Sequence, residues 1–167
     1  DLIDRFLRAL RPRRALLLAP TFSEYRRGLE GIGCEIEVFF LDKGKNFTVS
    51  ESILNVVRPG VDLVFLCDPN NPTGRRMEPE LLQALLDRCR EAGAFLAVDQ
   101  CFLELTEGDP NALVSQLTGG GLLLLRALTK SYALAGLRLG YCLCGDRVLL
   151  ERMEGLGSPW PVSAPAQ

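Results

Sequence analysis

Histidine is absent from the 167 residues, and methionine and tryptophan are scarce, at two and one. Without histidine the chain cannot form a His-ligated zinc site, a Ser-His-Asp triad or a Cys-His dyad. Lysine is also rare, since of the 19 basic residues only Lys43, Lys45 and Lys130 are lysines. Long apolar runs are missing as well, and a run such as residues 122–125 is far too short to span a bilayer.

Opposite charges nearly balance, because 19 basic residues face 21 acidic ones and the formal net charge is −2. Such a balance gives no reason to expect nucleic acid as a partner. Apolar residues make up 47% and charged residues 24%, which is ordinary for a soluble globular protein. The length fits one domain with a sizeable core.

Six cysteines lie mostly inside apolar runs that read as strands. Buried free cysteine packs as a small hydrophobe, so we expect reduced thiols and a cytoplasmic protein rather than disulfides. Cys142 and Cys144 would share one face of a strand, but no second pair or histidine completes a metal site. We therefore expect no metal.

Helical and strand-like patterns alternate along the whole chain. The expected helices are residues 2–10, 23–32, 50–57 (with Ser50 as N-cap), 79–92, 111–117 and 146–153. The expected strands are residues 15–19, 34–41, 61–67, 94–98, 121–125 and 139–144. Apolar runs of this length, alternating with helices, predict a doubly wound α/β fold whose mostly parallel sheet has helices on both faces.

The two ends of the chain suggest a piece of a longer protein. The sequence opens at Asp1 without an initiator methionine, and it stops at Gln167 in a stretch rich in proline and alanine. We expect residues 1–157 to form one domain and residues 158–167 to begin a connection leading out of it.

In such folds ligands bind beyond the carboxyl ends of the strands, so the residues after each strand matter most. The loop DPNNPTG, residues 68–74, follows the strand at 61–67 and offers the amides of Asn70 and Asn71. Its simpler interpretation is an Asx-type turn. Asp99 ends the next strand, where its carboxylate needs a cation or donors unless it is only a turn residue.

Two further segments follow strand ends. In RALTKSYALAGLRLGY, Lys130 stands among apolar residues, and burial there would prepare a neutral, nucleophilic amine, although a lone lysine is more often solvated. The planar fork of Arg138 suits a phosphate dianion. Phe22, in PTFSEY, could stack on an aromatic ligand, although a core position is the default for phenylalanine.

Together these residues match the needs of pyridoxal 5′-phosphate. Lys130 would form the imine, Asp99 would keep the pyridine nitrogen protonated, and Asn71 would donate to the phenolic oxygen. Arg138 and backbone groups would hold the phosphate.

The motifs NNPTG, the strand ending in Asp99, and LTKSYALAGLRLGY resemble, in the same order, those of the fold-type I pyridoxal-phosphate enzymes of the class I/II aminotransferase superfamily. PTFSEYRRGLE, DLVFLCDPNNPTG and RALTKSYALAGLRLGY are similar to its branch of threonine-phosphate decarboxylases and histidinol-phosphate aminotransferases. The resemblance implies the same roles for Lys130, Asp99, Asn71 and Arg138. It also implies that Phe22 stacks on one face of the cofactor ring and that Cys101 lies against the other.

Four positions depart from the family pattern. Phe102 stands where many aminotransferases have tyrosine, Gln100 replaces a glutamate, Ala127 replaces a serine or threonine that helps hold the phosphate, and Asp68 replaces an asparagine. The resemblance also implies a homodimer, a glycine-containing phosphate loop before Leu2 and a small C-terminal domain beginning near Trp160. Without both, we expect the chain alone to bind the cofactor poorly and to turn over little or nothing.

Three functions follow as hypotheses. The first is decarboxylation of a small phosphorylated amino acid, L-threonine O-3-phosphate, to (R)-1-amino-2-propanol O-2-phosphate for cobalamin biosynthesis. The second is an aminotransferase acting on histidinol phosphate or an aromatic amino acid. The third is a catalytically silent binding or regulatory module, which Ala127 and Gln100 favour slightly. The retained Lys130, Asp99, Asn71 and Arg138 argue against it, since nothing structural requires all four.

Overall fold

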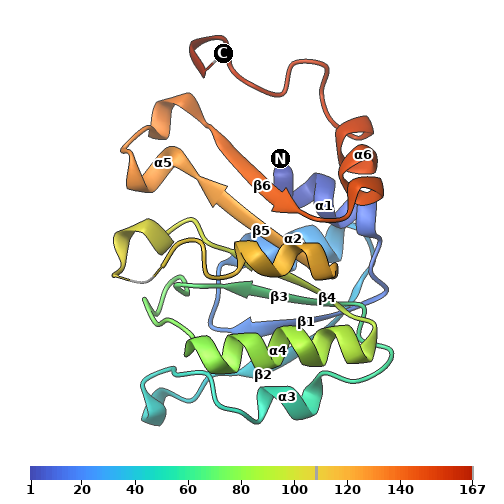
Figure 1. Ribbon diagram of the computed structural model, residues 1–167, viewed down its shortest axis with the longest axis vertical. Helices are drawn as coiled ribbons and strands as arrows, with labels where there is room; N and C mark the ends of the chain where they lie inside the picture. Colours follow the sequence, from blue (N-terminus) through green and yellow to red (C-terminus); the bar gives the residue numbers. More distant parts are fainter. Residues whose placement is uncertain (108, 167) are drawn as a thin grey trace.

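A six-stranded sheet forms the centre of the computed structural model, which describes residues 1–107 and 109–166 (Figure 1). The strand order is β2-β1-β3-β4-β5-β6, and all neighbours are parallel except β5 and β6. The strands are β1 (Arg14–Ala19), β2 (Glu35–Phe40), β3 (Leu63–Cys67), β4 (Phe95–Asp99), β5 (Leu122–Ala127) and β6 (Gly140–Cys144).

Helices cover both faces of this sheet, with α4 in front and α2 behind it in Figure 1. The α-helices are α1 (Leu2–Leu10), α2 (Ser23–Gly31), α3 (Ile53–Val56), α4 (Pro79–Ala92), α5 (Leu128–Ser131) and α6 (Arg147–Gly155). Short 3-10 helices occur at Lys43–Lys45, Leu103–Leu105, Val114–Gly119, Ala135–Leu137 and Ala164–Ala166. The core residues of α3 and α4 pack on one face, and those of α1, α2 and α6 on the other. The predicted doubly wound α/β fold is confirmed.

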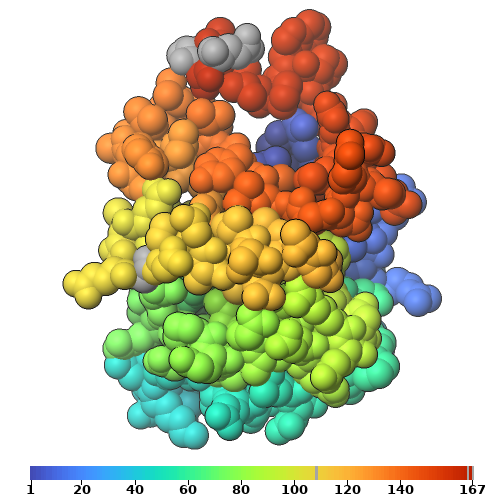
Figure 2. All heavy atoms as spheres, viewed as in Figure 1, coloured from blue at the N-terminus to red at the C-terminus, as the bar shows by residue number. Residues whose placement is uncertain are grey.

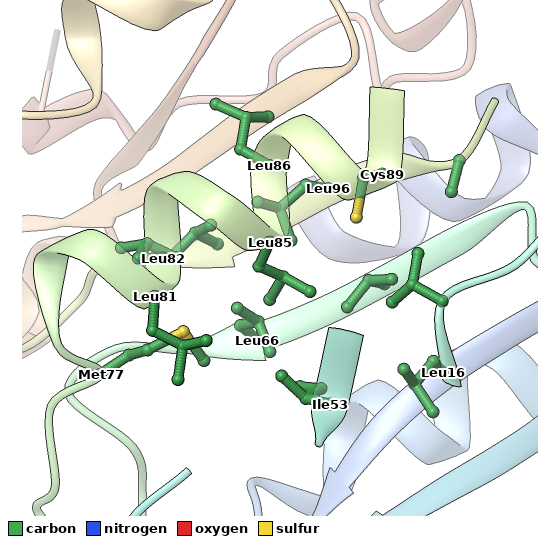
Figure 3. Packing of buried hydrophobic residues seen from close by; sticks show 14 of the residues in the cluster. Leu16, Ile53, Leu66, Met77, Leu81, Leu82, Leu85, Leu86, Cys89 and Leu96 are labelled. Carbon is green, nitrogen blue, oxygen red and sulfur yellow. The ribbon is translucent and has the colours of Figure 1, made fainter. Parts of the chain in front are cut away.

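Helix α4 shows how local sequence determines the packing. Pro79 occupies the first turn, where its missing N–H costs nothing, and Gly93 ends the helix with a left-handed φ of 72°. Between them one face is apolar and buried, through Leu81, Leu82, Leu85, Leu86 and Cys89. Figure 3 shows these side chains in one cluster with Leu66 of β3 and Leu96 of β4. The predicted boundaries and buried face of this helix are both confirmed.

Two glycines allow elements to approach closely. A Cβ at Gly28 of α2 would lie 2.7 Å from Leu7 Cδ1 of α1, and one at Gly140 of β6 would lie 2.8 Å from the carbonyl oxygen of Arg126. Real Cβ atoms do not come so close to backbone, so a larger residue at position 140 would push β6 away from β5.

Two predicted helices are wrong in extent or type. Within residues 50–57 only the single turn α3 is α-helical, and its N-cap is Ser52 without a side-chain cap bond. The predicted cap, Ser50, instead pairs its hydroxyl with that of Ser52 at 2.7 Å. Residues 111–117 are not an α-helix either: an Asx-type turn, with Asn111 N donating to Asp109 Oδ1 at 2.8 Å, leads into the 3-10 helix at Val114–Gly119.

After α6 the chain passes over the top of the molecule. Figure 2 shows this C-terminal segment above an opening in which the N-terminal helix is visible. Ser163 Oγ donates to the carbonyl oxygen of Leu137 at 3.0 Å, which ties the segment to the loop after α5. Gln167, the last residue of the expected connection, lies outside the described residues. Among the described helices none is long and apolar enough to cross a membrane.

Candidate functional site

The carboxyl ends of β1, β3, β4 and β5 open on one edge of the sheet, at the left in Figure 1. The last residues of these strands and the segments that follow them carry every residue predicted for the site. Because these strands are parallel, their carboxyl ends lie at the same edge of the sheet, and the fold itself brings these residues to that edge.

Asp99 is the last residue of β4 and is only 6% exposed. Its Oδ2 accepts a hydrogen bond from the Tyr25 hydroxyl at 2.7 Å, and its Oδ1 accepts one from the Cys101 backbone N–H at 3.0 Å. No Arg or Lys in residues 1–107 or 109–166 forms an ion pair with it. Asp99 is therefore a buried, hydrogen-bonded acidic group that has no counterion within the described chain.

Tyr25 is a site residue that the sequence analysis missed. It lies on the buried face of α2, is fully buried, and stacks on Phe65 with ring centroids 4.3 Å apart. Phe22 meets it edge-on at 5.5 Å. Burial raises the pKa of Tyr25 far above its usual value, and the charge of Asp99 raises it further, so the hydroxyl remains a donor. The signal in the sequence is the helical spacing from Tyr25 to Leu29, both of which face the core.

Asn70 holds two loops together. Its Nδ2 donates to the Pro20 carbonyl at 3.0 Å and to Thr73 Oγ1 at 2.9 Å, while Oδ1 accepts from Thr21 Oγ1 at 2.9 Å. This buried amide joins the loop after β3 to the loop after β1. Its role is structural, in line with the turn interpretation of DPNNPTG.

Asn71 is placed differently from its neighbour. It is half-buried, and its side chain makes no hydrogen bond within the described residues. It lines a cavity of about 280 Å³ together with Phe102 and Leu105. Its amide is therefore available to a ligand at the sheet edge.

Lys130 does not lie in the apolar surroundings that the sequence suggested. It is exposed, because α5 is a single turn at the open edge of the sheet. Its Nζ lies 5.9 Å from the centroid of the Phe102 ring, a cation–π contact that places the amine beside the Asn71 cavity.

Arg138 makes its side-chain hydrogen bond within its own loop and not to another predicted site residue. It is exposed, has a left-handed φ of 53°, and donates from Nη1 to the Ala135 carbonyl at 3.3 Å. No acidic side chain in the described residues pairs with it.

Two thiols flank Asp99. Cys67 is its register partner on β3, and Cys101 donates its backbone N–H to it. Burial, and then the charge of Asp99, raises the pKa of Cys67 to about 11 and that of Cys101 well above its usual value. Both therefore stay protonated near neutral pH, and the six cysteines are free, as predicted.

A polar row occupies the opposite face of the sheet at the same edge. Asp68 is 2% exposed, and its Oδ1 accepts a hydrogen bond from Met77 N at 2.8 Å. Its Oδ2 lies 3.8 Å from Arg76 Nε. Neither Asp68 Oδ2 nor Arg76 Nε has a hydrogen-bond partner within the described residues. Burial raises the pKa of Asp68, against the opposing effects of Met77 N–H and Arg76. Gln100 Oε1 accepts from Arg126 Nε at 3.1 Å.

Arg126 has no carboxylate partner in the part of the chain that the structure describes. Besides Gln100, it donates to the carbonyl oxygen of Pro110, so both its acceptors are neutral. Ala127 follows it at the end of β5 and offers no hydroxyl to a phosphate.

Comparison with known proteins gives the chain a family context. The family model "Aminotransferase class I and II" matches residues 1–167. The threonine-phosphate decarboxylase of Salmonella typhimurium is 39% identical over 155 residues, covering 93% of this chain and 43% of that protein. The histidinol-phosphate aminotransferase of Methanosarcina mazei is 32% identical over 148 residues, covering 88% of this chain and 38% of that protein.

Solved structures give the same fold. The histidinol-phosphate aminotransferase of Clostridium acetobutylicum superposes with a TM-score of 0.83 at 25% identity, covering 96% of this chain and 48% of that one. The L-threonine-O-3-phosphate decarboxylase of Porphyromonas gingivalis has a TM-score of 0.79 at 24% identity, covering 98% of this chain and 49% of that one. The chain thus spans less than half the length of these relatives.

Proposed function

Because the chain belongs to the class I and II aminotransferase family, we propose that it forms most of the pyridoxal-phosphate-binding domain of an L-threonine O-3-phosphate decarboxylase. The reaction would release carbon dioxide and leave (R)-1-amino-2-propanol O-2-phosphate. Sequence similarity to a protein named for this activity supports the choice, as does Phe102 at a position where many aminotransferases have tyrosine. We propose that the full protein acts as a cytoplasmic homodimer.

The observation that carries the cofactor assignment is Asp99. This acidic group is buried at the carboxyl edge of the sheet and holds two hydrogen bonds but no cation within the described residues. A buried carboxylate without a counterion is costly. A protonated pyridine nitrogen would supply the missing positive charge, so the donor set fits pyridoxal phosphate.

The bound cofactor would supply an aldehyde that condenses with amines and a ring that accepts the electron pair released at the substrate Cα. Asp99 would hold the proton on the ring nitrogen, and Asn71 would donate to the ring oxygen. Phe22, which is 38% exposed, would cover one face of the ring, and Cys101 would lie against the other.

Lys130 would hold the cofactor covalently and later deliver a proton to the substrate Cα in place of the lost carboxylate. Its exposure suits a group that must swing between two partners. Arg138, which has no acidic partner in the described chain, would bind the phosphate.

An aminotransferase acting on histidinol phosphate or an aromatic amino acid is the second candidate. The relatives from Methanosarcina mazei and Clostridium acetobutylicum favour it. Lys130 would then take the Cα proton, and no carbon dioxide would be released.

One experiment separates the two candidates. We would supply the complete reading frame that contains this chain with pyridoxal phosphate and L-threonine O-3-phosphate, and follow carbon dioxide and the cofactor spectrum together. Carbon dioxide release with an unchanged final spectrum supports the decarboxylase. Conversion to the pyridoxamine form without carbon dioxide contradicts it and supports the aminotransferase, whereas no cofactor binding at all would favour the silent module.

A further inference from the structure

Tyr25 joins two groups that come from different parts of the chain. Its hydroxyl donates to Asp99 Oδ2 at 2.7 Å, and its ring edge-packs against Phe22 with centroids 5.5 Å apart. The ring is itself fixed from behind by Phe65, at 4.3 Å, in the fully buried core. One rigid side chain therefore contacts both the carboxylate and the aromatic ring at the sheet edge.

The environment of this hydroxyl is otherwise apolar or neutral. The thiol of Cys67 interacts with both Tyr25 and Asp99, the thiol of Cys101 interacts with Asp99, and the raised pKa of each thiol keeps it neutral. Of the two hydrogen bonds to the Asp99 carboxyl group within residues 1–107 and 109–166, the one from Tyr25 comes from a side-chain hydroxyl and the other from the Cys101 backbone N–H.

We propose that Tyr25 is a positioning residue for the cofactor ring, an inference that rests on the proposed function. Its hydroxyl fixes the plane of the Asp99 carboxylate so that a free lone pair faces the ring nitrogen of pyridoxal phosphate. Its ring sets the position of Phe22 at the same time. Without the hydroxyl, the carboxylate can turn about its Cβ–Cγ bond and bond to water at the open edge, and its hydrogen bond to the ring nitrogen weakens.

The test measures binding rather than turnover. Dissociation constants of the full-length protein are compared for pyridoxal phosphate and for its 1-deaza analogue, in which a C–H group replaces the ring nitrogen. The change of this ratio between the unmodified protein and a variant reports the contact between Asp99 and the ring nitrogen, because the other differences between the two compounds are the same in both proteins. We expect a strong preference for pyridoxal phosphate in the unmodified protein, a roughly tenfold smaller preference in Tyr25→Phe, and little preference in Asp99→Asn.

Comparing Tyr25→Leu with Tyr25→Phe separates the two contacts of this residue. It removes both the hydroxyl and the ring, so it should weaken binding of both compounds as well as reducing the preference. If Tyr25→Phe does not fold, 3-fluorotyrosine at position 25 keeps the ring and makes the hydroxyl a stronger donor, and the preference should then rise.

A preference in Tyr25→Phe that stays within about twofold of the unmodified protein, or that rises, overturns the positioning role while leaving the proposed function intact. An unmodified protein that binds neither compound overturns both.

Discussion

The hydroxyl of Tyr25 and the carboxyl group of Asp99 lie 2.7 Å apart in the core, although 74 residues separate them in the sequence. Both are buried, and no Arg or Lys in the described chain pairs with Asp99. The bond links α2 to the end of β4 and so connects one helical layer with the sheet edge at which the candidate site lies.

We predict that Tyr25→Phe lowers the free energy of unfolding by about 1–3 kcal/mol in the absence of ligand, because it leaves a buried carboxylate oxygen without its donor. Urea denaturation measures this change. Tyr132→Phe is the matched control, since Tyr132 is 57% exposed, and should change stability by less than about 0.5 kcal/mol. Equal effects in the two variants would show that the Tyr25 hydroxyl contributes nothing specific.

Lys130→Ala should abolish covalent attachment of the cofactor, because it removes the proposed amine. The complete protein would be mixed with pyridoxal phosphate, reduced with borohydride and digested, and the labelled lysine identified by mass spectrometry. The label should fall on Lys130 and disappear in the variant. Lys43→Ala is the control, because Lys43 is an exposed lysine of a polar turn. Labelling of Lys43 or Lys45 in place of Lys130 would contradict the assignment.

Local patterns were enough to predict some elements. Helix α4 matches its predicted range because Pro79, the leucine spacing and Gly93 all act within a few residues of one another. The meeting of strand ends at one edge also followed from the alternating pattern. The antiparallel pairing of β6 with β5 could not be predicted in this way, since no local feature specifies the direction of an edge strand.

Contacts between distant segments were harder to predict. The contact between Tyr25 and Asp99 could not be predicted from local patterns, because it depends on how α2 packs against the sheet. Apolar neighbours of Lys130 suggested burial, yet the loop that holds them is open and the lysine is exposed. The catalytic and binding roles of Lys130, Asn71 and Arg138 remain predictions.

Asp68→Asn should stabilise the protein at neutral pH. The pKa of Asp68 is raised from 3.8, so the folded state holds this proton more tightly than the unfolded chain does. The stability that comes from the protonated Asp68 is fully present below the pKa of this group in the unfolded chain. It is lost as the pH rises through the higher pKa of the folded state. The positive charge of Arg76 does not cancel the raised pKa of Asp68, because Arg76 Nε lies 3.8 Å from Asp68 Oδ2 without a hydrogen bond.

An asparagine cannot ionise, and its oxygen can still accept from Met77 N–H. We expect a gain of about 1 kcal/mol at pH 7 that vanishes below about pH 4. Urea denaturation of both proteins at the two pH values measures it, with exposed Asp4→Asn as control. A loss of stability at pH 7 would mean that attraction to Arg76 outweighs burial.

Gln100→Glu should give Arg126 a carboxylate partner, since its present acceptors are the Gln100 amide and the Pro110 carbonyl. A charged acceptor forms a stronger hydrogen bond than a neutral one. The new charge would, however, lie beside Asp68, because the two residues follow the register pair Cys67–Asp99 on neighbouring strands. Like charges on adjacent strand ends repel one another.

The benefit of Gln100→Glu should therefore depend on position 68. The family resemblance points to asparagine at position 68 and glutamate at position 100. In this chain the carboxyl group is instead at position 68 and the amide at position 100, on the neighbouring strand end. We expect Gln100→Glu to stabilise the Asp68→Asn protein by at least about 0.5 kcal/mol more than it stabilises the unmodified one. A double-mutant cycle by urea denaturation at pH 7 measures this coupling. Additive effects would show that the two positions are independent and that the two departures arose without compensating each other.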